Sequence, residues 1–429
     1  MLSSFYIRNF RSILELRLDF SYGEGKAPNG YQDQEVMPFI EVGKQRLVPC
    51  IAFFGANASG KTNLLNALSA LDQLILKGRK LANIFEPNLL NTKYTETTFE
   101  INFYRGDDSF SYRIAYSATA ISEEALLKNG EAIFTIRQLK AEFAPQIRST
   151  AYSEEKLSDI IRVECSDGEG GPQTKPFLHR IGLGYSGLHP DLKNAFGYFE
   201  SAIQIFDNDG LIVFPSAVEY LASAMGGDEV EALREITDVV RRLDIDIDAI
   251  NITETELGSE DAPHRGALLK ENSKTGVRHS VNINTLHTDI NGNPVFLNFI
   301  KHESAGTQRL AGLIALILHA LKTGGVLLVD ELECSLHPLL MREIVLLFKK
   351  RRCNTKGAQL IFTTHNTDIL DDSILRISEI ALVRKTVANG TLVRRLVDAK
   401  KDGEDIRNVT NFRKQYLAGF YAGVPHPAL

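Results

Sequence analysis

The spacing of apolar residues predicts alternating strands and helices at the start of the chain. Apolar and charged residues alternate over 14–20, a period of two that is typical of a half-buried strand. The apolar run 51–54 predicts a buried strand, and apolar residues at helical spacing over 64–75 predict an amphipathic helix. The alternating runs 98–104 and 110–116, joined by Gly-Asp-Asp, predict a β-hairpin.

The middle of the chain follows a different pattern. An apolar stripe predicts a helix over 228–243, and the pair Asn291-Gly292 predicts a hairpin turn. The run Asp244-Ile-Asp-Ile-Asp248 invites a metal site, but the alternation of isoleucine with aspartate favours a strand with one wet face. No long heptad tract occurs, so an extended coiled-coil arm is not expected. We therefore expect three parts, residues 1–140, a mixed α+β insertion at 141–300, and residues 301–429.

The first candidate for chemistry is the loop between the strand at 51–54 and the helix that follows it. It reads Gly55-Ala-Asn-Ala-Ser-Gly-Lys-Thr62, the spacing G-x-x-x-x-G-K-[ST] of a phosphate-binding loop. Glycines let the backbone turn so that its N–H groups surround phosphate oxygens, and the helix dipole adds positive potential. We expect Lys61 to reach the β- and γ-phosphates of ATP and Thr62 to bind Mg²⁺. The expected nucleotide contacts are Gly55, Asn57, Ala58, Ser59, Gly60, Lys61, Thr62 and Asn63.

Two acids follow a second apolar strand. In Gly325-Val-Leu-Leu-Val-Asp-Glu331, the carboxylates stand at the carboxyl end of four apolar residues. Burying two acids at a strand end is costly unless a cation or ligand meets them. We expect Asp330 to hold Mg²⁺, directly or through water, and Glu331 to polarise the attacking water.

The composition indicates the class of protein and the cellular compartment in which this chemistry is expected. At 44% hydrophobic and 24% charged residues, the 429-residue chain has the make-up of a globular protein. The four cysteines are far apart and form no C-x-x-C pair, which argues against a disulfide framework and fits a reducing cytosol. No apolar run reaches transmembrane length, and the first residues lack the layout of a signal peptide. We expect a cytoplasmic protein without membrane contact.

The N-terminal pattern carries a family resemblance. Ile7-Arg-Asn-Phe-Arg-Ser12, followed by a strand and the phosphate loop, resembles the start of the RecF/SMC/OLD group of ABC-type ATPases. The resemblance implies an α/β ABC-ATPase head, with a P-loop mixed sheet flanked by helices and an antiparallel β-lobe, interrupted by the α+β insertion. Arg8 and Arg11 either reach a nucleotide phosphate or ribose or stay exposed on a strand edge. No glutamine is assigned to the Q-loop of such a head.

Residues before the apolar helix at 310–321 resemble the ABC signature loop. Ser304, Gly306 and Gln308 occupy its diagnostic places, whereas Glu303 replaces its usual leucine. In ABC dimers this loop meets the γ-phosphate bound by the opposite subunit. The resemblance therefore implies nucleotide contacts from these three residues and a homodimer or higher oligomer assembled through the ATP sites. The alternative is an ordinary serine cap at a helix N-terminus.

Later segments fit the same family. The segment 333–338 resembles the D-loop, and His365, at the end of the apolar run 359–364, resembles the switch histidine that contacts the γ-phosphate. The catalytic residues implied are Glu331, Lys61 and His365. The basic run 349–352 is interpreted as a solvated helix C-terminus, with a DNA or RNA contact as the alternative.

The end of the chain suggests a biological role. Tyr416-Leu-Ala-Gly-Phe-Tyr-Ala-Gly-Val-Pro425 is similar to the ending of stand-alone AAA-family ATPases of bacterial abortive-infection and anti-phage operons. The similarity implies an ATPase that controls a separately encoded effector, a nuclease or toxin. The alternative is a RecF-like DNA-repair ATPase, which needs a basic DNA-facing groove that the net charge of −6 does not suggest. A fused Toprim nuclease of the OLD type is not expected, because no D-x-D follows His365.

Overall fold

A computed structural model describes most of the chain. The described residues are 1–23, 35–147, 152–168, 170–185, 187–206, 210–243, 246–258, 267–271, 277–334, 336–401 and 412–418. They form two compact units, and both are discontinuous in sequence. Unit 1 contains Met1–Ile205, Gly324–Glu331 and Ile344–Leu429, and unit 2 contains Phe206–Thr323 and Leu332–Glu343.

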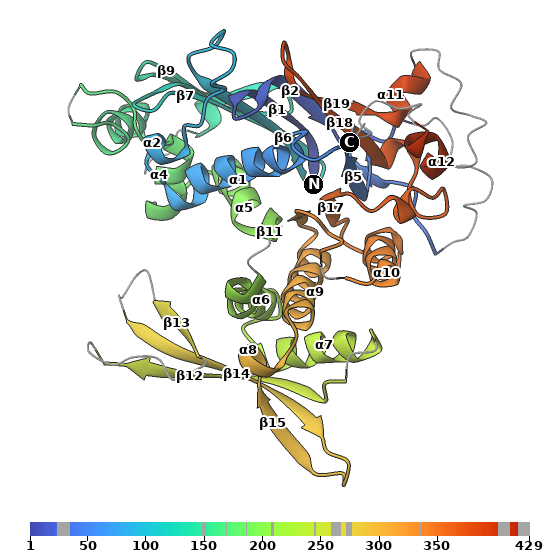
Figure 1. Cartoon of the computed structure of the whole chain (residues 1–429). Coiled ribbons are helices and arrows are strands. Elements are labelled where there is room, and N and C mark those ends of the chain that lie inside the picture. Colours follow the sequence, from blue (N-terminus) through green and yellow to red (C-terminus); the bar gives the residue numbers. More distant parts are fainter. Residues whose placement is uncertain are drawn as a thin grey trace. The chain divides into compact units, whose positions relative to one another are not determined.

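Unit 1 is organised by a 13-stranded sheet (Figure 1). In chain order its strands are β1 (Leu2–Phe10), β2 (Ile13–Asp19), β5 (Cys50–Phe54), β6 (Thr97–Arg105), β7 (Asp108–Tyr116), β8 (Ile121–Lys128), β9 (Glu131–Arg137), β10 (Lys140–Phe143), β11 (Ile203–Phe206), β16 (Val326–Val329), β17 (Gln359–Thr364), β18 (Ile380–Thr386) and β19 (Gly390–Arg395). Their order across the sheet is β10-β9-β8-β7-β6-β1-β2-β19-β18-β5-β17-β16-β11. A separate hairpin joins β3 (Ile40–Val42) to β4 (Gln45–Leu47).

The sheet is parallel where the candidate chemistry lies and antiparallel elsewhere. β5 runs parallel to both β17 and β18, and β16 runs parallel to β17. All residues of β5, β16 and β17 are buried, as expected for strands covered on both faces. The antiparallel strands continue into this part through the pairing of Gly390 on β19 with Ile13 on β2. The predicted β-lobe and the predicted P-loop sheet are therefore one continuous sheet.

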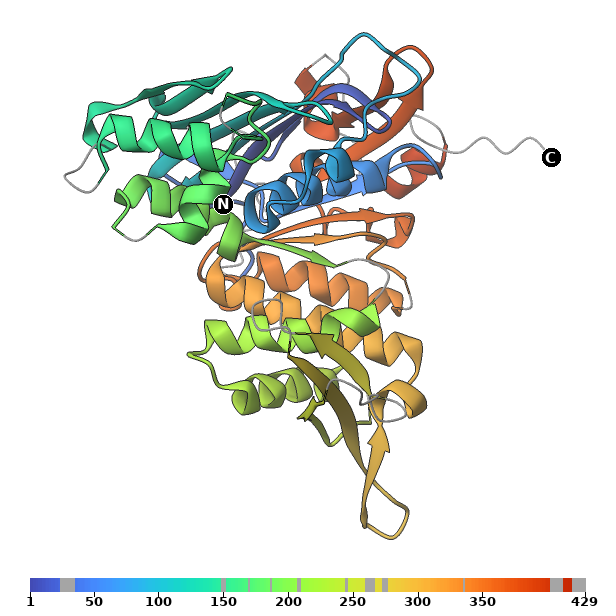
Figure 2. The ribbon, with the colours of Figure 1, turned by 90° about the vertical axis from the view of Figure 1, so that its left-hand side faces the viewer.

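Helices complete unit 1. They are α1 (Lys61–Lys77), α2 (Leu81–Ile84), α3 (Glu154–Asp159), α4 (Phe177–Gly184), α5 (Pro190–Ala202), α11 (Leu396–Lys401), α12 (Phe412–Leu417) and the last part of α10 (Pro338–Lys349). Figures 1 and 2 show α1, α4 and α5 gathered on one face of the sheet. The apolar stripe of α1, which includes Leu64, Leu68, Leu71 and Ile75, is buried there.

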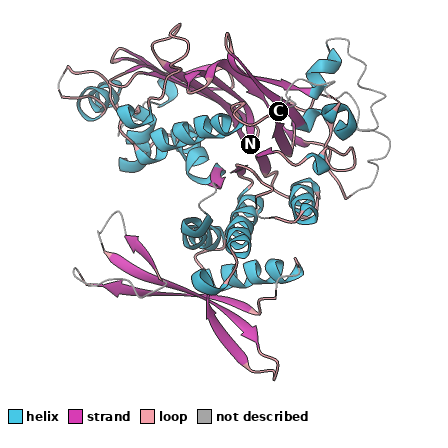
Figure 3. Ribbon diagram, viewed as in Figure 1, coloured by secondary structure: helices cyan, strands magenta, loops and turns pink. Residues whose placement is uncertain are grey.

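Unit 2 combines helices with a second, four-stranded sheet. The helices are α6 (Gly210–Ala224), α7 (Glu229–Arg242), α8 (Phe299–His302) and α9 (Ala305–Thr323), and the strands are β12 (Ala249–Leu257), β13 (Leu268–Glu271), β14 (Arg278–Thr288) and β15 (Pro294–Asn298). β14 lies at the centre, with β12 along one edge, and β13 and β15 pair with different halves of its other edge. Figure 3 shows the strands of this unit to one side of its helices.

Several sequence predictions for the middle of the chain are confirmed. The helix expected over 228–243 is α7, which Asp228 caps by accepting from the backbone N–H of Glu231. Asn291 and Gly292 lie in the turn of the β14–β15 hairpin, as predicted. The strand expected over Asp244–Asp248 begins only at Ala249, and Asp244 and Ile245 lie outside the described residues.

Other expectations need correction. The compact units do not follow the predicted three ranges, because 141–205 packs with unit 1 and the signature-like loop with α9 belongs to unit 2. Lys349 is not a solvated end of a basic run. It is fully buried, with its ammonium 2.6 Å from the carboxylate of Glu379. Within the described ranges, no cluster of three or more His, Cys, Asp or Glu side chains is arranged to hold a metal ion.

No helix in the described part of the chain is both long enough and apolar enough to cross a membrane.

Candidate nucleotide-binding site

The phosphate loop joins β5 to α1 along a path that requires glycine at two positions. Gly60 has a φ of +99°, and a Cβ there would lie 2.1 Å from Thr391 Oγ1. A Cβ on Gly55 would lie 2.3 Å from the carbonyl oxygen of Val383. No side chain of the described residues caps helix α1, and its first turn carries no acid, so no charge in this turn offsets the positive end of the helix dipole, which attracts an anion.

Two side chains of the loop fit a bound polyphosphate. Lys61 is 6% exposed, and its ammonium donates to the carbonyl oxygens of Gly55 at 2.9 Å and Ala56 at 3.1 Å, which holds the charge inside the loop. The hydroxyl of Ser59 is buried and has no hydrogen-bond partner among the described residues. An unsatisfied buried polar group costs about 1–3 kcal/mol, and a phosphate oxygen would recover that energy.

Among the remaining residues of the loop, three are exposed to solvent and one, Asn63, is hydrogen-bonded to another part of the chain. Asn57, Ala58 and Thr62 are exposed, so the hydroxyl of Thr62 is open to solvent in the first turn of α1. The amide of Asn63 turns away from the loop and donates to Ser12 Oγ at 2.7 Å. Thr62 is thus available for the expected Mg²⁺ contact, whereas the side-chain amide of Asn63 serves a structural bond.

The two predicted acids end β16 and share one threonine. Thr363 on β17 donates its hydroxyl to Asp330 Oδ1 at 2.5 Å and accepts from the backbone N–H of Glu331 at 2.8 Å. Glu331 adopts a φ of +49°, in the left-handed region that residues other than glycine rarely occupy. Such backbone strain persists only where the surrounding structure holds it, and it is concentrated at functional sites. Thr363 is a site residue that the sequence interpretation missed.

Parallel pairing brings the three motifs to one edge of the sheet. Phe54 pairs with Thr364, and Val329 pairs with Phe362, so β5, β17 and β16 end at nearly the same level. The phosphate loop, His365 and the acid pair leave these strand ends in neighbouring positions. The side chain of His365 is exposed there. Carboxyl ends of adjacent parallel strands are a common location for ligand sites in α/β proteins.

Two turns from distant parts of the chain brace the phosphate loop. Ser12, between β1 and β2, shares a hydroxyl–hydroxyl hydrogen bond of 2.7 Å with Thr391 on β19. Thr391 Oγ1 also donates to the carbonyl oxygen of Ser59 at 3.2 Å. The sequence interpretation assigned no role to either residue: Ser12 ends the quoted N-terminal pattern, Thr391 belongs to no motif, and 379 positions separate them.

The two N-terminal arginines have different surroundings. Arg11 forms an ion pair with Glu86, and its guanidinium reaches Asn63 Oδ1 at 3.5 Å. Arg8 donates to Thr98 Oγ1 at 2.7 Å, on the neighbouring antiparallel strand β6. The structure therefore places Arg11 beside the phosphate loop and Arg8 in the antiparallel part of the sheet.

The signature-like loop lies in unit 2, at the N-terminus of the 19-residue helix α9. Ser304 is exposed and accepts from the backbone N–H of Thr307 at 3.1 Å, and the half-exposed Gly306 lies in the first turn. Gln308, by contrast, is buried and its amide donates to the carbonyl oxygens of Phe299, Ile300 and Glu303. This geometry favours a structural role for Gln308, which closes the turn from α8 to α9, rather than the expected nucleotide contact.

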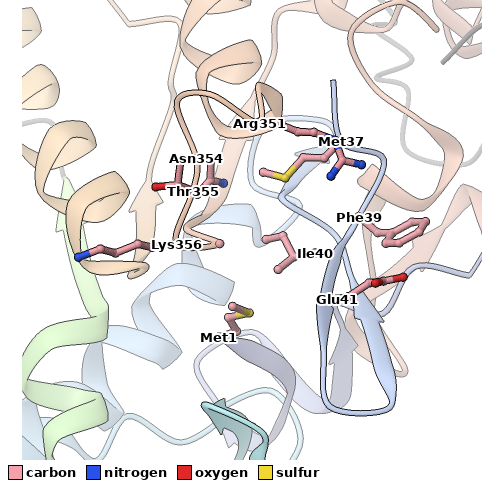
Figure 4. Close-up of a pocket in the computed structure, with 10 residues that line it drawn as sticks. Met1, Met37, Phe39, Ile40, Glu41, Arg351, Asn354, Thr355 and Lys356 are labelled. Atoms are coloured by element: carbon pink, nitrogen blue, oxygen red, sulfur yellow. The ribbon is translucent and has the colours of Figure 1, made fainter. Parts of the chain in front are cut away.

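A cavity of about 550 Å³ lies elsewhere in unit 1 (Figure 4). Its lining combines apolar side chains with Glu41, Arg351 and Lys356, and Figure 4 shows Met1 and Ile40 beside it. The turn that lines it precedes β17, so it is near the amino ends of the parallel strands. The phosphate loop is not part of its lining, and this cavity is not the candidate nucleotide site.

The comparison with solved structures finds SMC head domains. The SMC head domain from Thermotoga maritima is 13% identical, with a TM-score of 0.38, and the match covers 92% of this chain and 98% of that chain. The Smc head domain with an extended coiled coil, bound to the C-terminal domain of ScpA derived from Pyrococcus furiosus, is 13% identical with a TM-score of 0.40 and covers 95% and 99%. These scores are too low to support a functional argument.

The family comparison is more informative. No curated protein matches the chain. The family model described as "AAA domain, putative AbiEii toxin, Type IV TA system" matches residues 50–164 and 185–371. The matched ranges include the phosphate loop, the signature-like loop, the acid pair and His365, and they make up well over half of the sequence. The protein therefore belongs to this family of AAA-domain ATPases.

Proposed function

We propose that this protein binds and hydrolyses ATP with Mg²⁺, that two copies complete each other's ATP sites, and that the ATP cycle regulates a separately encoded effector in anti-phage defence. The observation that carries the ATPase proposal is the meeting of the phosphate loop, the acid pair and His365 at the ends of three adjacent parallel strands. The inward-facing ammonium of Lys61 and the unsatisfied hydroxyl of Ser59 support a phosphate as the ligand of this loop.

The proposed reaction is in-line hydrolysis of the γ-phosphate. A water oxygen forms a bond to the γ-phosphorus while the bond from that phosphorus to the β–γ bridging oxygen breaks, and ADP leaves. Glu331 polarises the water and takes its proton, which then passes to the phosphate product. Lys61 offsets the charge on the phosphoryl oxygens, and His365 contacts the γ-phosphate. Thr62 and Asp330 would hold Mg²⁺, which would supply positive charge that offsets the negative charge of the phosphates.

The partner copy would contribute Ser304. This serine is exposed at the N-terminus of α9, and the first turn of that helix, all of whose residues the structure describes, contains no aspartate or glutamate. Unpaired N–H groups and the helix dipole make such an end attractive to a phosphate that another subunit binds. The effector role is supported by the description of the family, which refers to a type IV toxin–antitoxin system.

Steady-state ATPase measurements test the catalytic proposal. The wild-type protein should hydrolyse ATP with Mg²⁺, and Glu331→Gln should lower turnover by at least about 100-fold while it keeps ATP bound, because the base is lost and the phosphate contacts remain. Lys61→Ala should lose ATP binding itself, as measured by titration with a fluorescent ATP analogue. Glu142→Gln, an exposed acid on β10, is the matched control. Normal turnover in Glu331→Gln would refute the assignment of the base.

A further inference from the structure

The β14–β15 hairpin of unit 2 presents apolar side chains on a rigid tip. Ile290 is fully exposed at the tip, and Phe296 on β15 is 62% exposed. The tip is held by Asp289, whose carboxylate accepts from the backbone N–H groups of Asn291 at 2.8 Å and Asn293 at 2.7 Å. Figures 1 and 2 both show this hairpin extending away from α6, α7 and α9 of its own unit. An ordered turn that holds an isoleucine in water is preorganised for binding an apolar pocket.

The charge around the hairpin restricts what could cover it. No lysine or arginine occurs between positions 279 and 300. Asp289 lies at the tip, and Asp248 lies beside it, where it accepts from Thr288 Oγ1 at 2.7 Å and lies 4.0 Å from the guanidinium of Arg241 on α7. A nucleic-acid backbone would be repelled by the carboxylate of Asp289 at the tip. A second copy packed through a two-fold axis would bring two acidic tips together, which is also unfavourable.

The base of the same hairpin is hydrogen-bonded to the signature-like loop. Thr285 Oγ1 donates to Glu303 Oε1 at 2.7 Å, and His287 Nε2 lies 2.8 Å from the same oxygen. Glu303 immediately precedes Ser304 and occupies the position where the ABC signature has leucine. The departure from the family pattern therefore has a structural reason, since a leucine could not accept these bonds.

The exposed Phe296 and the residues that contact Glu303 lie at neighbouring positions of the β14–β15 pair. Phe296 pairs with Leu286, which lies between Thr285 and His287. Because side chains alternate along a strand, Phe296 and Leu286 share one face, and Thr285 and His287 point to the opposite face toward Glu303. A partner that displaces Phe296 and Leu286 would thus move the two residues that position the signature-like loop.

We propose that the β14–β15 hairpin is the docking site of the effector protein, which inserts Ile290 and Phe296 into an apolar pocket bordered by basic side chains. Docking is transmitted to Ser304 through Thr285, His287 and Glu303. This inference rests on the proposed function, because the occupant is the effector that the ATPase regulates. Glu303 and His287 are positioning residues in this account, since they act on the ATP site through Ser304.

The test uses the full-length chain and the purified protein product of the gene that adjoins its own. Affinity is measured by isothermal titration calorimetry for the wild type, for the double variant Ile290→Ser/Phe296→Ser, and for the control Val163→Ser/Leu183→Ser, which removes two comparably exposed apolar side chains from unit 1. We expect the hairpin variant to bind at least about 100-fold more weakly, as central apolar anchors do. The control should bind like the wild type, and both variants should keep the basal ATPase rate.

Each other outcome has a defined meaning. Unchanged affinity in the hairpin variant, or no binding by the wild type, would overturn the docking site. Light scattering tests whether a second copy of the chain covers the hairpin instead. If the wild type without effector is a dimer and the hairpin variant is a monomer, the effector docking site would be overturned. A lack of ATP hydrolysis by the wild type would instead contradict the proposed function. The comparison of binding affinities would still test the docking site, because it does not depend on hydrolysis.

A second variant tests the transmission of docking. Glu303→Gln leaves the exposed face of the hairpin intact and weakens the bonds to Thr285 and His287. We expect it to bind the effector with wild-type affinity, while the ratio of ATPase rates with and without effector moves toward one. Glu254→Gln, a change on β12 of the same sheet, is the matched control. A wild-type rate ratio in Glu303→Gln would refute the coupling.

Discussion

The hydroxyl of Thr363 yields the most specific prediction about the acid pair. Its side chain is fully buried on β17 and makes hydrogen bonds of 2.5 Å to Asp330 and 2.8 Å to the backbone of Glu331. Thr363→Val keeps the shape of the side chain and removes both bonds. A hydrogen bond to a charged group contributes about 1.5–3 kcal/mol and a neutral one about 1 kcal/mol, so the free energy of unfolding should fall by about 2–4 kcal/mol.

The same substitution should impair the proposed chemistry. Without the hydroxyl, the Asp330 carboxylate loses a hydrogen bond that orients it, and Glu331 loses a bond that supports its left-handed backbone. If about half of the lost energy, about 1–2 kcal/mol, is expressed in the transition state, kcat falls roughly 5- to 30-fold, because each 1.36 kcal/mol is a factor of about ten. The Mg²⁺ concentration that gives half-maximal activity should rise at the same time.

Urea unfolding and ATPase assays over a range of Mg²⁺ concentrations measure these effects. Thr363→Ser is the matched control, because it keeps the hydroxyl and loses only a methyl group. The reasoning would be refuted by a valine variant with the wild-type rate and Mg²⁺ dependence. A serine variant as impaired as the valine variant would assign the effect to packing rather than to the hydrogen bonds.

Three further predictions concern stability. Gly60→Ala should lower the free energy of unfolding by about 1–3 kcal/mol because of its positive φ, and by a further amount because the new Cβ meets a threonine hydroxyl. Gly130→Ala is the control, since Gly130 has a φ of +87° but open space around it, and urea unfolding should show only the cost of the positive φ. Equal losses in the two variants would refute the contact argument. Burial raises the pKa of Asp72 to about 7, so the native state keeps a proton that the unfolded chain has released, and stability should fall as pH rises from about 4 to 7. Asp72→Asn should therefore raise the free energy of unfolding by up to about 4 kcal/mol at pH 8 and by only about 2 kcal/mol at pH 5, and an equal effect at both pH values would contradict this. Lys349→Met should cost about 3–5 kcal/mol because it leaves the Glu379 carboxylate buried without its cation, and a variant that also carries Glu379→Met should recover much of that loss in the same unfolding assay.

The motifs with fixed spacing could be predicted from sequence because each is local. The phosphate loop needs only a buried strand, two glycines and a helix start, and all of these can be identified within residues 51–75. The acid pair and His365 follow apolar runs that predict buried strands, and parallel pairing then brings their ends together. The roles of these residues in hydrolysis stay predictions.

The residues that support the site could not be predicted in the same way. Ser12, Thr363 and Thr391 are ordinary polar residues, and each acquires its partner only when strands from distant parts of the sequence pair. Lys349 belongs to a basic run that predicts a solvated surface, and its burial depends on the distant acid Glu379. Gln308 matched a motif position, yet the turn from α8 to α9 uses its amide internally.

The compact units also follow tertiary packing rather than sequence character. Residues 141–205 look like part of an insertion because they contain turn-rich stretches, but α4 and α5 bury their apolar residues together with α1. Helix α9 follows the signature-like loop in sequence and packs with α6 and α7 in unit 2. Periodicity predicts which face of an element is apolar, but it does not say which other element covers that face.

Complementation between two inactive variants tests the central claim, a shared ATP site, most directly. Lys61→Ala disables the phosphate loop, and Ser304→Arg blocks the signature-like loop, so each protein alone should lack activity. In a 1:1 mixture, half of the dimers are mixed and each has one intact composite site, so we predict about a quarter of the wild-type ATPase rate. Activity that stays at the level of the separate variants would contradict a site completed by the partner copy.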